Sequence, residues 1–238
     1  MTVTPVSIAS PSTSFTDDEL AEISASFESA PASKVIRWAV DTFSPHLCLT
    51  ASMTDAVLID LATKVDPGIE VVFIDTGYHF PETLQTVDVV RRRYALNLHL
   101  LTVPHSDPPL WTQQTGCCSQ AKVAQLDRAL AGKQAWLSGL RRSEADSRTD
   151  APVVGRDRRG LVKVNPLANW SDADIAGYIA DHDVPVNPLT AQGYPSIGCM
   201  PCTTPVAPGE DPRAGRWRGL DKAECGIHTD LEIDGSGI

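Results

Sequence analysis

The stretch "HLCLTASMTDAVLIDLATKVDPGIEVVFID" (residues 46–75) decides the fold. Two short apolar runs, residues 46–51 and 70–75, flank residues 56–65, whose apolar side chains recur at helical spacing. A strand, a helix and a second strand in this order predict a parallel β-α-β unit, because parallel strands need a long crossover connection.

The same alternation continues on both sides of this unit. Helices are expected in "TDDELAEISASF", where Thr16 and Glu19 fit a capping box, in "SKVIRWAVDTF", in "PETLQTVDVVRRRY", after Cys118 and in "SDADIAGYIADH", which Ser171 caps. Strands are expected at "LHLLTV" (98–103) and "AWLSG" (135–139), with "VKVNPL" beyond them. We therefore predict an α/β fold with a doubly wound parallel sheet, which helices cover on both faces. Such sheets bind ligands at the carboxyl ends of their strands, here in the loops after residues 51, 75 and 139.

Composition and length indicate one large globular domain with extensions. The chain has 238 residues, of which 42% are apolar and 21% charged, enough to build a sizeable core. Residues 1–15, rich in Ser, Thr and Pro, are expected to be a disordered tail. Residues 16–205 would form the α/β domain. Residues 206–238 read as an irregular C-terminal arm, because Pro and Gly become frequent after about residue 183.

Charge and hydropathy bear on whether the protein binds nucleic acid or a membrane. The formal net charge of −10 argues against general nucleic-acid binding. No apolar run approaches the length that crosses a bilayer, and the first residues lack the pattern of a signal peptide, so we expect a cytoplasmic protein without a membrane partner. The sequence leaves open whether the chain forms a homo-oligomer.

Four of the six cysteines form two pairs. Cys117 and Cys118 are adjacent, and Cys199 and Cys202 form a C-x-x-C loop. Four thiolates suffice for tetrahedral zinc or for an iron–sulfur cluster. Adjacent cysteines hold one small ion poorly because their side chains diverge, yet spacing alone leaves both ligands open, with unligated thiols as a third reading.

The other two cysteines stand apart. Cys48 lies within an apolar strand and reads as an inert core residue. Cys225, in "KAECGIH", has Gly226 and His228 nearby, and is either a nucleophile with a low pKa or a spare surface thiol.

Several motifs together resemble one family. "FIDTGYHFPETL", "CC" followed by Lys122, "GLRR", "NPLANW", "GYPSIGCMPCT", "DPRAGRW" and "ECGIH" are similar to motifs of the assimilatory sulfonucleotide reductases, and more closely to those of the adenosine 5′-phosphosulfate (APS) reductases of bacteria and plants. The resemblance covers residues 46 to 228. It implies a Rossmann-like fold of the adenine-nucleotide alpha-hydrolase type.

The resemblance also implies a chemistry. Cys117, Cys118, Cys199 and Cys202 would hold one four-iron, four-sulfur (4Fe-4S) cluster, which lies close to the nucleotide and acts electrostatically. The Cys225 thiolate would attack the sulfur of APS. AMP would leave, an S-sulfocysteine would remain, and thioredoxin would release sulfite, in sulfate assimilation towards cysteine.

Most of the residues expected to bind the nucleotide lie in three loops and two basic clusters. Residues 141–163 carry seven basic and four acidic side chains, a net of +3, and Arg213, Arg216 and Arg218 form a second cluster. Such cations suit the negative charge of a departing AMP. Taken with the resemblance, these features predict that the nucleotide is contacted by Thr50, Ser52, Asp55, Asp75, Thr76, Gly77, Lys122, Gly139, Arg141, Arg142, Arg148, Arg213, Arg216 and His228.

Some of these residues also have a structural reading. Ser52 and Asp55 are placed to cap the helix at 56–65, a role compatible with anion binding at its N-terminus. Lys122 follows Cys118 by one helical turn, so its ammonium is expected to reach both the cluster and the substrate, or else to be a plain surface charge. Arg156, Arg158 and Arg159 read as solvated residues with scattered ion pairs.

The chain departs from the family pattern in three places. Ala121 stands where arginine is frequent, "QQTG" stands before the first cysteine pair where relatives often have histidine, and the loop after residue 51 is one residue short. These departures concern the pocket for the substrate.

Three other functions compete with APS reduction. A reductase of 3′-phosphoadenosine 5′-phosphosulfate (PAPS), or one acting on both nucleotides, is the nearest, although members restricted to PAPS typically lack both cysteine pairs. An ATP-pyrophosphatase or sulfurtransferase would need an S-G-G-x-D-S loop, which "TASMTDA" does not contain. A four-cysteine zinc module would have no use for "ECGIH".

Overall fold

The structure is a computed structural model that describes residues 14–104, 119–219 and Glu224. Its centre is a six-stranded sheet in the order β3-β2-β1-β4-β6-β5. The strands are β1 (Leu47–Thr50), β2 (Glu70–Asp75), β3 (Asn97–Thr102), β4 (Ala135–Ser138), β5 (Val154–Arg156) and β6 (Val162–Val164). All neighbouring pairs are parallel except β5 with β6. The predicted mostly parallel α/β fold is therefore confirmed.

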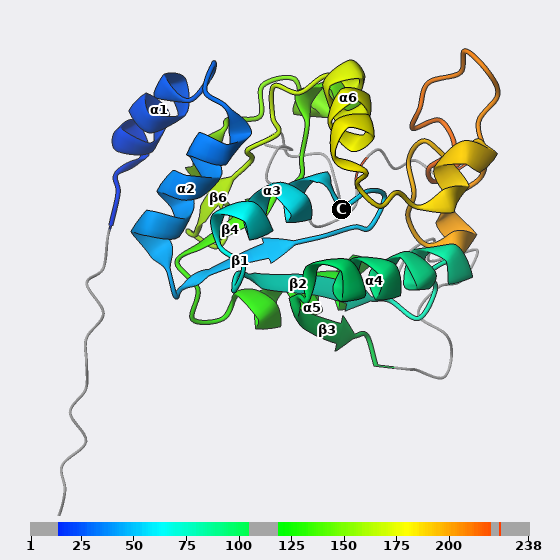
Figure 1. Cartoon of the computed structure of the whole chain (residues 1–238), viewed down its shortest axis with the longest axis horizontal. Coiled ribbons are helices and arrows are strands. Elements are labelled where there is room, and N and C mark those ends of the chain that lie inside the picture. Colours follow the sequence, from blue (N-terminus) through cyan, green and yellow to red (C-terminus); the bar gives the residue numbers. More distant parts are fainter. Residues whose placement is uncertain (1–13, 105–118, 220–223, 225–238) are drawn as a thin grey trace, which may run out of the picture.

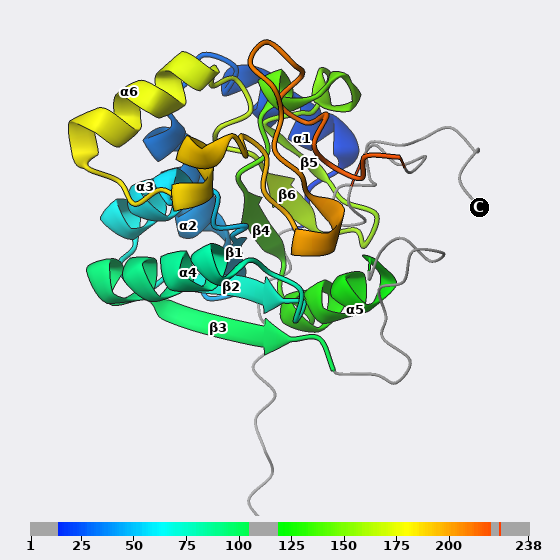
Figure 2. The ribbon, with the colours of Figure 1, turned by 90° about the vertical axis from the view of Figure 1, so that its right-hand side faces the viewer.

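Helices cover both faces of the sheet. They are α1 (Asp17–Ser26), α2 (Ala32–Phe43), α3 (Val57–Val65), α4 (Pro81–Tyr94), α5 (Ser119–Leu130) and α6 (Asp172–His182), with the short 3-10 helices η1 (Arg142–Glu144), η2 (Asp146–Arg148), η3 (Pro188–Gln192) and η4 (Met200–Cys202). Figure 2 shows α5 on the opposite side of the sheet from α2, α3 and α4.

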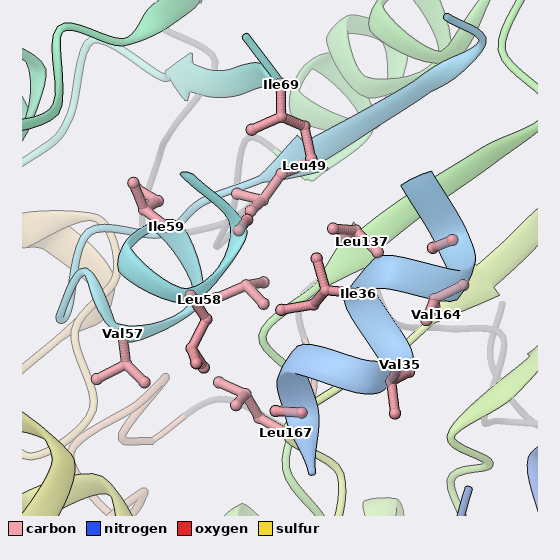
Figure 3. Close-up of a cluster of buried hydrophobic side chains, with 14 of the residues drawn as sticks. Val35, Ile36, Leu49, Val57, Leu58, Ile59, Ile69, Leu137, Val164 and Leu167 are labelled. Carbon is pink, nitrogen blue, oxygen red and sulfur yellow. The ribbon is translucent and has the colours of Figure 1, made fainter. Parts of the chain in front are cut away.

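Successive side chains along the central strands point to opposite faces of the sheet and pack into two hydrophobic cores. Leu49 and Leu137 point to the larger core and pack with Ile36 of α2 and Leu58 of α3 (Figure 3). Their neighbours Cys48 and Trp136 face the smaller core under α5, together with Leu126 of that helix. Because both faces are covered, these strands are apolar without interruption, which is how the sequence revealed them.

Several predicted caps are present. Thr16 and Glu19 form a reciprocal capping box at α1, and Ser171 forms another at α6 with Asp174. The sequence did not predict β5, because a three-residue strand containing Gly155 has no readable alternation. Phe15 already packs against Trp38, one residue before the predicted start of the domain.

Chain order reverses beside β1. The chain adds β2 and β3 on one side of β1, then crosses to add β4 on its other side. Ligands of such sheets bind outside the carboxyl ends of the strands at this switch point. In Figure 1 the gold and orange segment that follows α6 lies at the end to which the arrows of β1 and β3 point.

The segment after α6 fixes the loop after β1. The buried side chain of Asn187 donates to the Met53 carbonyl at 3.2 Å and to Thr83 Oγ1 at 3.0 Å, while its backbone N donates to the Thr54 carbonyl at 3.0 Å. Met53 is itself fully buried and holds a left-handed φ of 64°. The loop is therefore held in a conformation that few side chains adopt.

A polar contact ties α6 to α3. Tyr178 Oη donates to Asp60 Oδ2 at 2.6 Å, and Lys64 pairs with the same carboxylate at 2.6 Å.

Among the described residues, no helix is both long and apolar enough to cross a membrane.

Candidate active site

The C-x-x-C loop docks on the loop after β2. Thr76 Oγ1 lies 3.1 Å from Cys199 Sγ, the Met200 N donates to the Tyr78 carbonyl at 2.7 Å, and His79 pairs with Cys199 in an isolated bridge. β2 ends at Asp75, so the two cysteines lie at the carboxyl end of the parallel sheet. The Thr76 hydroxyl, predicted to line the nucleotide, faces a cysteine sulfur.

Cys199 and Cys202, the two predicted ligands that the structure describes, suit a metal centre that prefers sulfur ligands. Cys199 is partly exposed, Cys202 is buried, and no disulfide joins either of them to another described cysteine. If Cys199 is ionised, its sulfur can only accept a hydrogen bond, and the Thr76 hydroxyl is then the donor. Donors of this kind hold the ligands of metal sites in place. Within the described ranges, no three His, Cys, Asp or Glu side chains gather as a metal site. Cys117 and Cys118 lie outside those ranges.

Residues 203–217, here called the return segment, run back along the C-x-x-C loop. Thr204 N donates to the Gly215 carbonyl at 2.9 Å, and Trp217 N donates to the Cys202 carbonyl at 2.9 Å. The return segment crosses the predicted domain boundary at residue 205 as one hydrogen-bonded unit. It thereby brings Arg213 and Arg216 next to the cysteine loop.

Arg216 is held rigidly over that loop. Its guanidinium lies 4.4 Å from the ring centroid of Trp217 and donates to Ser196 Oγ at 3.2 Å. A Cβ on Gly198 would come within 2.3 Å of Arg216 Nη2, so a larger residue at this position would displace the guanidinium from the place it has here. Arg216 therefore presents a preorganised cation beside Cys199.

Glu224, the first residue of "ECGIH", is buried against the loop after β4. Arg148 of that loop donates two hydrogen bonds to the Glu224 carboxylate, from Nε and Nη2, each of 2.8 Å. Ser147 Oγ donates at 3.1 Å and Arg213 Nη2 donates at 3.1 Å. Arg148 also pairs with Glu144. Glu224 thus lies at the same end of the sheet as the C-x-x-C loop.

The charges around Glu224 keep it ionised. Burial disfavours its charged form, but the hydrogen bonds and charge of Arg148, with help from Arg213 and Ser147, outweigh burial and hold the pKa of Glu224 below its ordinary value. Since all four donors need an acceptor, the ionised carboxylate is the form that satisfies them.

Arg141 and Arg142 each have carboxylate partners within the protein. Arg141 pairs with Asp172 at 2.6 Å and with Glu144 at 3.5 Å. Arg142 donates to both oxygens of Glu28, each at 2.8 Å, so it ties the turn between α1 and α2 to the loop after β4. Their assignment to the nucleotide stays a prediction.

The loop after β1 holds a carboxyl group in an unusual setting. Asp55 Oδ1 accepts from the N of Val57, the first residue of α3, at 2.9 Å. The N-cap of this helix is Ala56 and has no side-chain cap, so neither Ser52 nor Asp55 is the predicted N-cap. Burial raises the pKa of Asp55, against this hydrogen bond and the charge of Arg141. Ser52 is exposed, and Thr50 Oγ1 lies 3.4 Å from the Leu137 carbonyl of β4.

The other predicted contacts are placed as follows. Asp75 Oδ1 accepts from the N of Gly77, whose φ of 74° explains the glycine. A Cβ on Gly139 would meet only Leu58, at an ordinary 3.8 Å, so the described chain itself does not require glycine there. Lys122 lies on α5, partly buried, and has no ion pair with another described residue. Cys225 and His228 lie outside the described residues.

Two other features are separate from this site. Burial raises the pKa of the Cys48 thiol to about 12, in keeping with an inert core residue. An open depression of about 630 Å³ is lined by residues including Gly132, Lys133 and Arg159, at the amino ends of the strands, opposite the site.

Sequence reasoning did not identify Glu224 and Asn187 as site residues. Glu224 stands next to the expected nucleophile, but its burial depends on arginines 76 and 11 positions away. Asn187 precedes a proline, which indicated only a turn. Neither position carried a local signal of its long-range contacts.

Known proteins resemble this chain over most of its length. A family model described as the phosphoadenosine phosphosulfate reductase domain matches residues 46–205. A protein of Streptomyces coelicolor named adenosine 5′-phosphosulfate reductase is 47% identical over 211 residues, which cover 84% of this chain and 89% of that protein. One of the same name from Mycolicibacterium smegmatis is 44% identical over 91% of this chain and 98% of its own length.

Solved structures agree with the fold. The phosphoadenylyl-sulfate (PAPS) reductase of Candida auris, as a phosphate complex, superposes with a TM-score of 0.66 at 29% identity, over 81% of this chain and 98% of that one. An FMN adenylyltransferase of Candida glabrata, at 15% identity and a TM-score of 0.56 over 77% of this chain and 72% of its own, shares the fold alone. The matches in sequence and structure show that this chain belongs to the phosphoadenosine phosphosulfate reductase family.

Proposed function

We propose that this protein is an oxidoreductase that reduces APS to sulfite and AMP, with thioredoxin as the reductant, in sulfate assimilation. The observation that carries the proposal is the burial of Glu224 against the loop after β4. Glu224 directly precedes the expected nucleophile, and it lies at the carboxyl end of the sheet, where nucleotides bind in such folds. The names of the relatives support the same reaction.

The proposed reaction has two steps. The Cys225 thiolate attacks the sulfur of APS, an S–S bond forms, and the S–O bond to the AMP phosphate breaks with its electron pair leaving on AMP. A thioredoxin thiolate then attacks Cys225 Sγ and sulfite leaves with the electron pair of the S–S bond. The second thioredoxin thiol resolves the mixed disulfide, so the dithiol supplies the two electrons.

The described residues suit the first step. The AMP phosphate gains negative charge as the S–O bond breaks, and a cation that is already fixed stabilises that charge without reorganising. Arg216 is such a cation, because Ser196 and the Trp217 ring hold it. Lys122 adds a charge that no described carboxylate neutralises.

The same proposal includes one 4Fe-4S cluster held by Cys117, Cys118, Cys199 and Cys202. Bound there, it would supply a fixed charge centre that acts on the nucleotide site electrostatically. The position of the C-x-x-C loop at the carboxyl end of the sheet, with the Thr76 hydroxyl beside Cys199 Sγ, supports this ligand set. Iron and acid-labile sulfide in anaerobically purified protein test it directly, and zinc in their place would contradict it.

PAPS is the alternative substrate. The description of the family and the Candida auris structure favour it. The two cysteine pairs and the names of the more similar relatives favour APS. Rates of sulfite release from both nucleotides, with thioredoxin, decide between them, and a higher kcat/KM on PAPS would overturn the proposed specificity.

The intermediate provides the sharpest test of the mechanism. Incubation of the holoprotein with APS and no reductant is expected to add one sulfite-sized mass to the peptide carrying Cys225, and none to a Cys225→Ser protein that keeps its iron. Turnover without an adduct, or an adduct on another cysteine, would contradict the mechanism. A cytoplasmic location, where thioredoxin keeps thiols reduced, belongs to the same proposal.

A further inference from the structure

Glu224 directly precedes the expected nucleophile in the chain and is one of the most buried carboxylates that the structure describes. We propose that Glu224 is a positioning residue: its contacts with Arg148, Arg213 and Ser147 dock the "ECGIH" motif on the loop after β4 and so place the Cys225 thiol for attack. The inference rests on the proposed function, and it assigns Arg148 to the motif rather than to the nucleotide.

The geometry differs from that of a surface ion pair. The side chains of Glu224 and Arg148 are 1% and 7% exposed, whereas those of Glu210 and Arg218, paired at the same distance of 2.8 Å, are 29% and 49% exposed. Four hydrogen bonds reach the two oxygens of Glu224. A buried carboxylate with every oxygen satisfied fixes its position far better than a solvated one does.

Charge pairing explains why Arg148 acts through Glu224. Arg148 lies between the carboxylates of Glu224 and Glu144, and Arg213 also pairs with Glu224. A nucleotide anion would have to displace Glu224 to reach Arg148. Displacement would take two of its four hydrogen bonds from a buried carboxylate, which is strongly unfavourable. Arg148 is therefore better matched to the motif than to the substrate.

The contacts also join the two halves of the site. Ser147 and Arg148 belong to η2 after β4, while Arg213 belongs to the return segment that hydrogen-bonds to the C-x-x-C loop. Glu224 is the residue that both groups contact. Its contacts thus fix the residue that precedes the expected nucleophile relative to the loop that carries Cys199 and Cys202.

The test compares the Glu224→Gln and Glu210→Gln holoproteins. Glutamine keeps the shape of Glu224 but lacks the charge and replaces one acceptor oxygen by a donor. We expect Glu224→Gln to lower kcat on APS on the order of 10- to 10²-fold, as small misplacements of reacting groups do, with an AMP dissociation constant within twofold of wild type. Glu210→Gln, which removes an exposed pair of the same length, should change neither.

A second readout is independent of catalysis. Without nucleotide, Cys225 should be alkylated by iodoacetamide several-fold faster in Glu224→Gln than in wild type or Glu210→Gln, as measured by peptide mass spectrometry. Ser147→Ala removes one of the four hydrogen bonds to Glu224. It should lower kcat and speed alkylation of Cys225, each by less than Glu224→Gln does. This variant provides both measurements if Glu224→Gln does not fold.

The outcomes separate the two proposals. Unchanged kcat and unchanged alkylation in Glu224→Gln would overturn the positioning role, as would unchanged values in Ser147→Ala if only that variant folds. A loss of AMP affinity matching the loss of kcat would return Arg148 to the nucleotide. If wild-type protein does not reduce APS, the proposed function fails, and faster alkylation still establishes the docking of the motif.

Discussion

Replacing Gly215 by alanine tests whether the return segment holds the site together. A Cβ at this position would lie 2.1 Å from the Thr204 carbonyl oxygen and 3.1 Å from Val206 Cγ1. Ordinary contacts begin at 3.4 Å, so the backbone of residue 204 would have to move by about 1.3 Å. No rotamer change relieves the overlap, because the obstructing atom belongs to the backbone.

The size of the effect follows from what that movement breaks. Overpacking of this kind costs about 1–3 kcal/mol, and the hydrogen bond from Thr204 N to the Gly215 carbonyl adds about 1 kcal/mol. A loss of about 2–4 kcal/mol corresponds to a fall in Tm on the order of 10 °C for a chain of this size. Because the movement also displaces Arg213 and Arg216, kcat/KM on APS should fall with it.

Thermal unfolding of the holoprotein by circular dichroism measures the effect, and Gly177→Ala provides the control. Gly177 lies within α6, and a Cβ there would meet nothing within 4 Å. Alanine should stabilise this helix by about 0.5–1 kcal/mol. A Gly215→Ala protein that melts and turns over like wild type would refute the reasoning about the return segment.

Three further perturbations test other parts of the structure. Cys199→Ser should lower iron content and activity together, whereas Cys48→Ala, in the core under α5, should keep both; full iron in the first variant would contradict the ligand set. Lys122→Ala should lower kcat/KM on APS about 10²-fold without changing Tm, and unchanged kinetics would make Lys122 a surface charge. Burial opposes ionisation of Asp60, but hydrogen bonds from Lys64 and Tyr178 outweigh burial and lower the pKa of Asp60. The ionised carboxylate therefore stabilises the folded state above about pH 4, and this stabilisation is lost as the pH falls through the pKa of Asp60 in the folded protein. Asp60→Asn should therefore reduce the free energy of unfolding at pH 7 and flatten its dependence on pH below 4, as urea titrations would measure; a variant as stable as wild type at pH 7 would contradict this.

The fold was predictable because its strands are buried on both faces. Residues 47–49 and 71–74 are apolar without interruption, and they lie within β1 and β2. The antiparallel strand β5 was not predictable, because its identity depends on pairing with β6 and on packing against α1 rather than on its three residues. Local patterns specify elements, whereas pairing depends on the rest of the chain.

The site was predictable only as a set of residue types. The cysteine motifs and the arginines could be named from the sequence, but their partners could not. Thr76 followed a strand and was expected to face the nucleotide, yet its hydroxyl meets Cys199, which is 123 residues away. Arg142 stands in a basic cluster, yet it reaches back 114 residues to Glu28. Such contacts follow from the fold, so spacing along the chain carries no trace of them.

The strand order has a consequence for biosynthesis. β1 lies in the middle of the sheet, but its neighbour β4 follows 88 residues later, as the pairing of Leu47 with Ala135 shows. Synthesis proceeds from the N-terminus, so β1 can pair with β2 on the ribosome while its other edge, formed by four consecutive residues with three apolar side chains, has no partner. An open apolar edge of this kind pairs readily with other chains, and a nascent chain that stalls before residue 135 would expose it to aggregation.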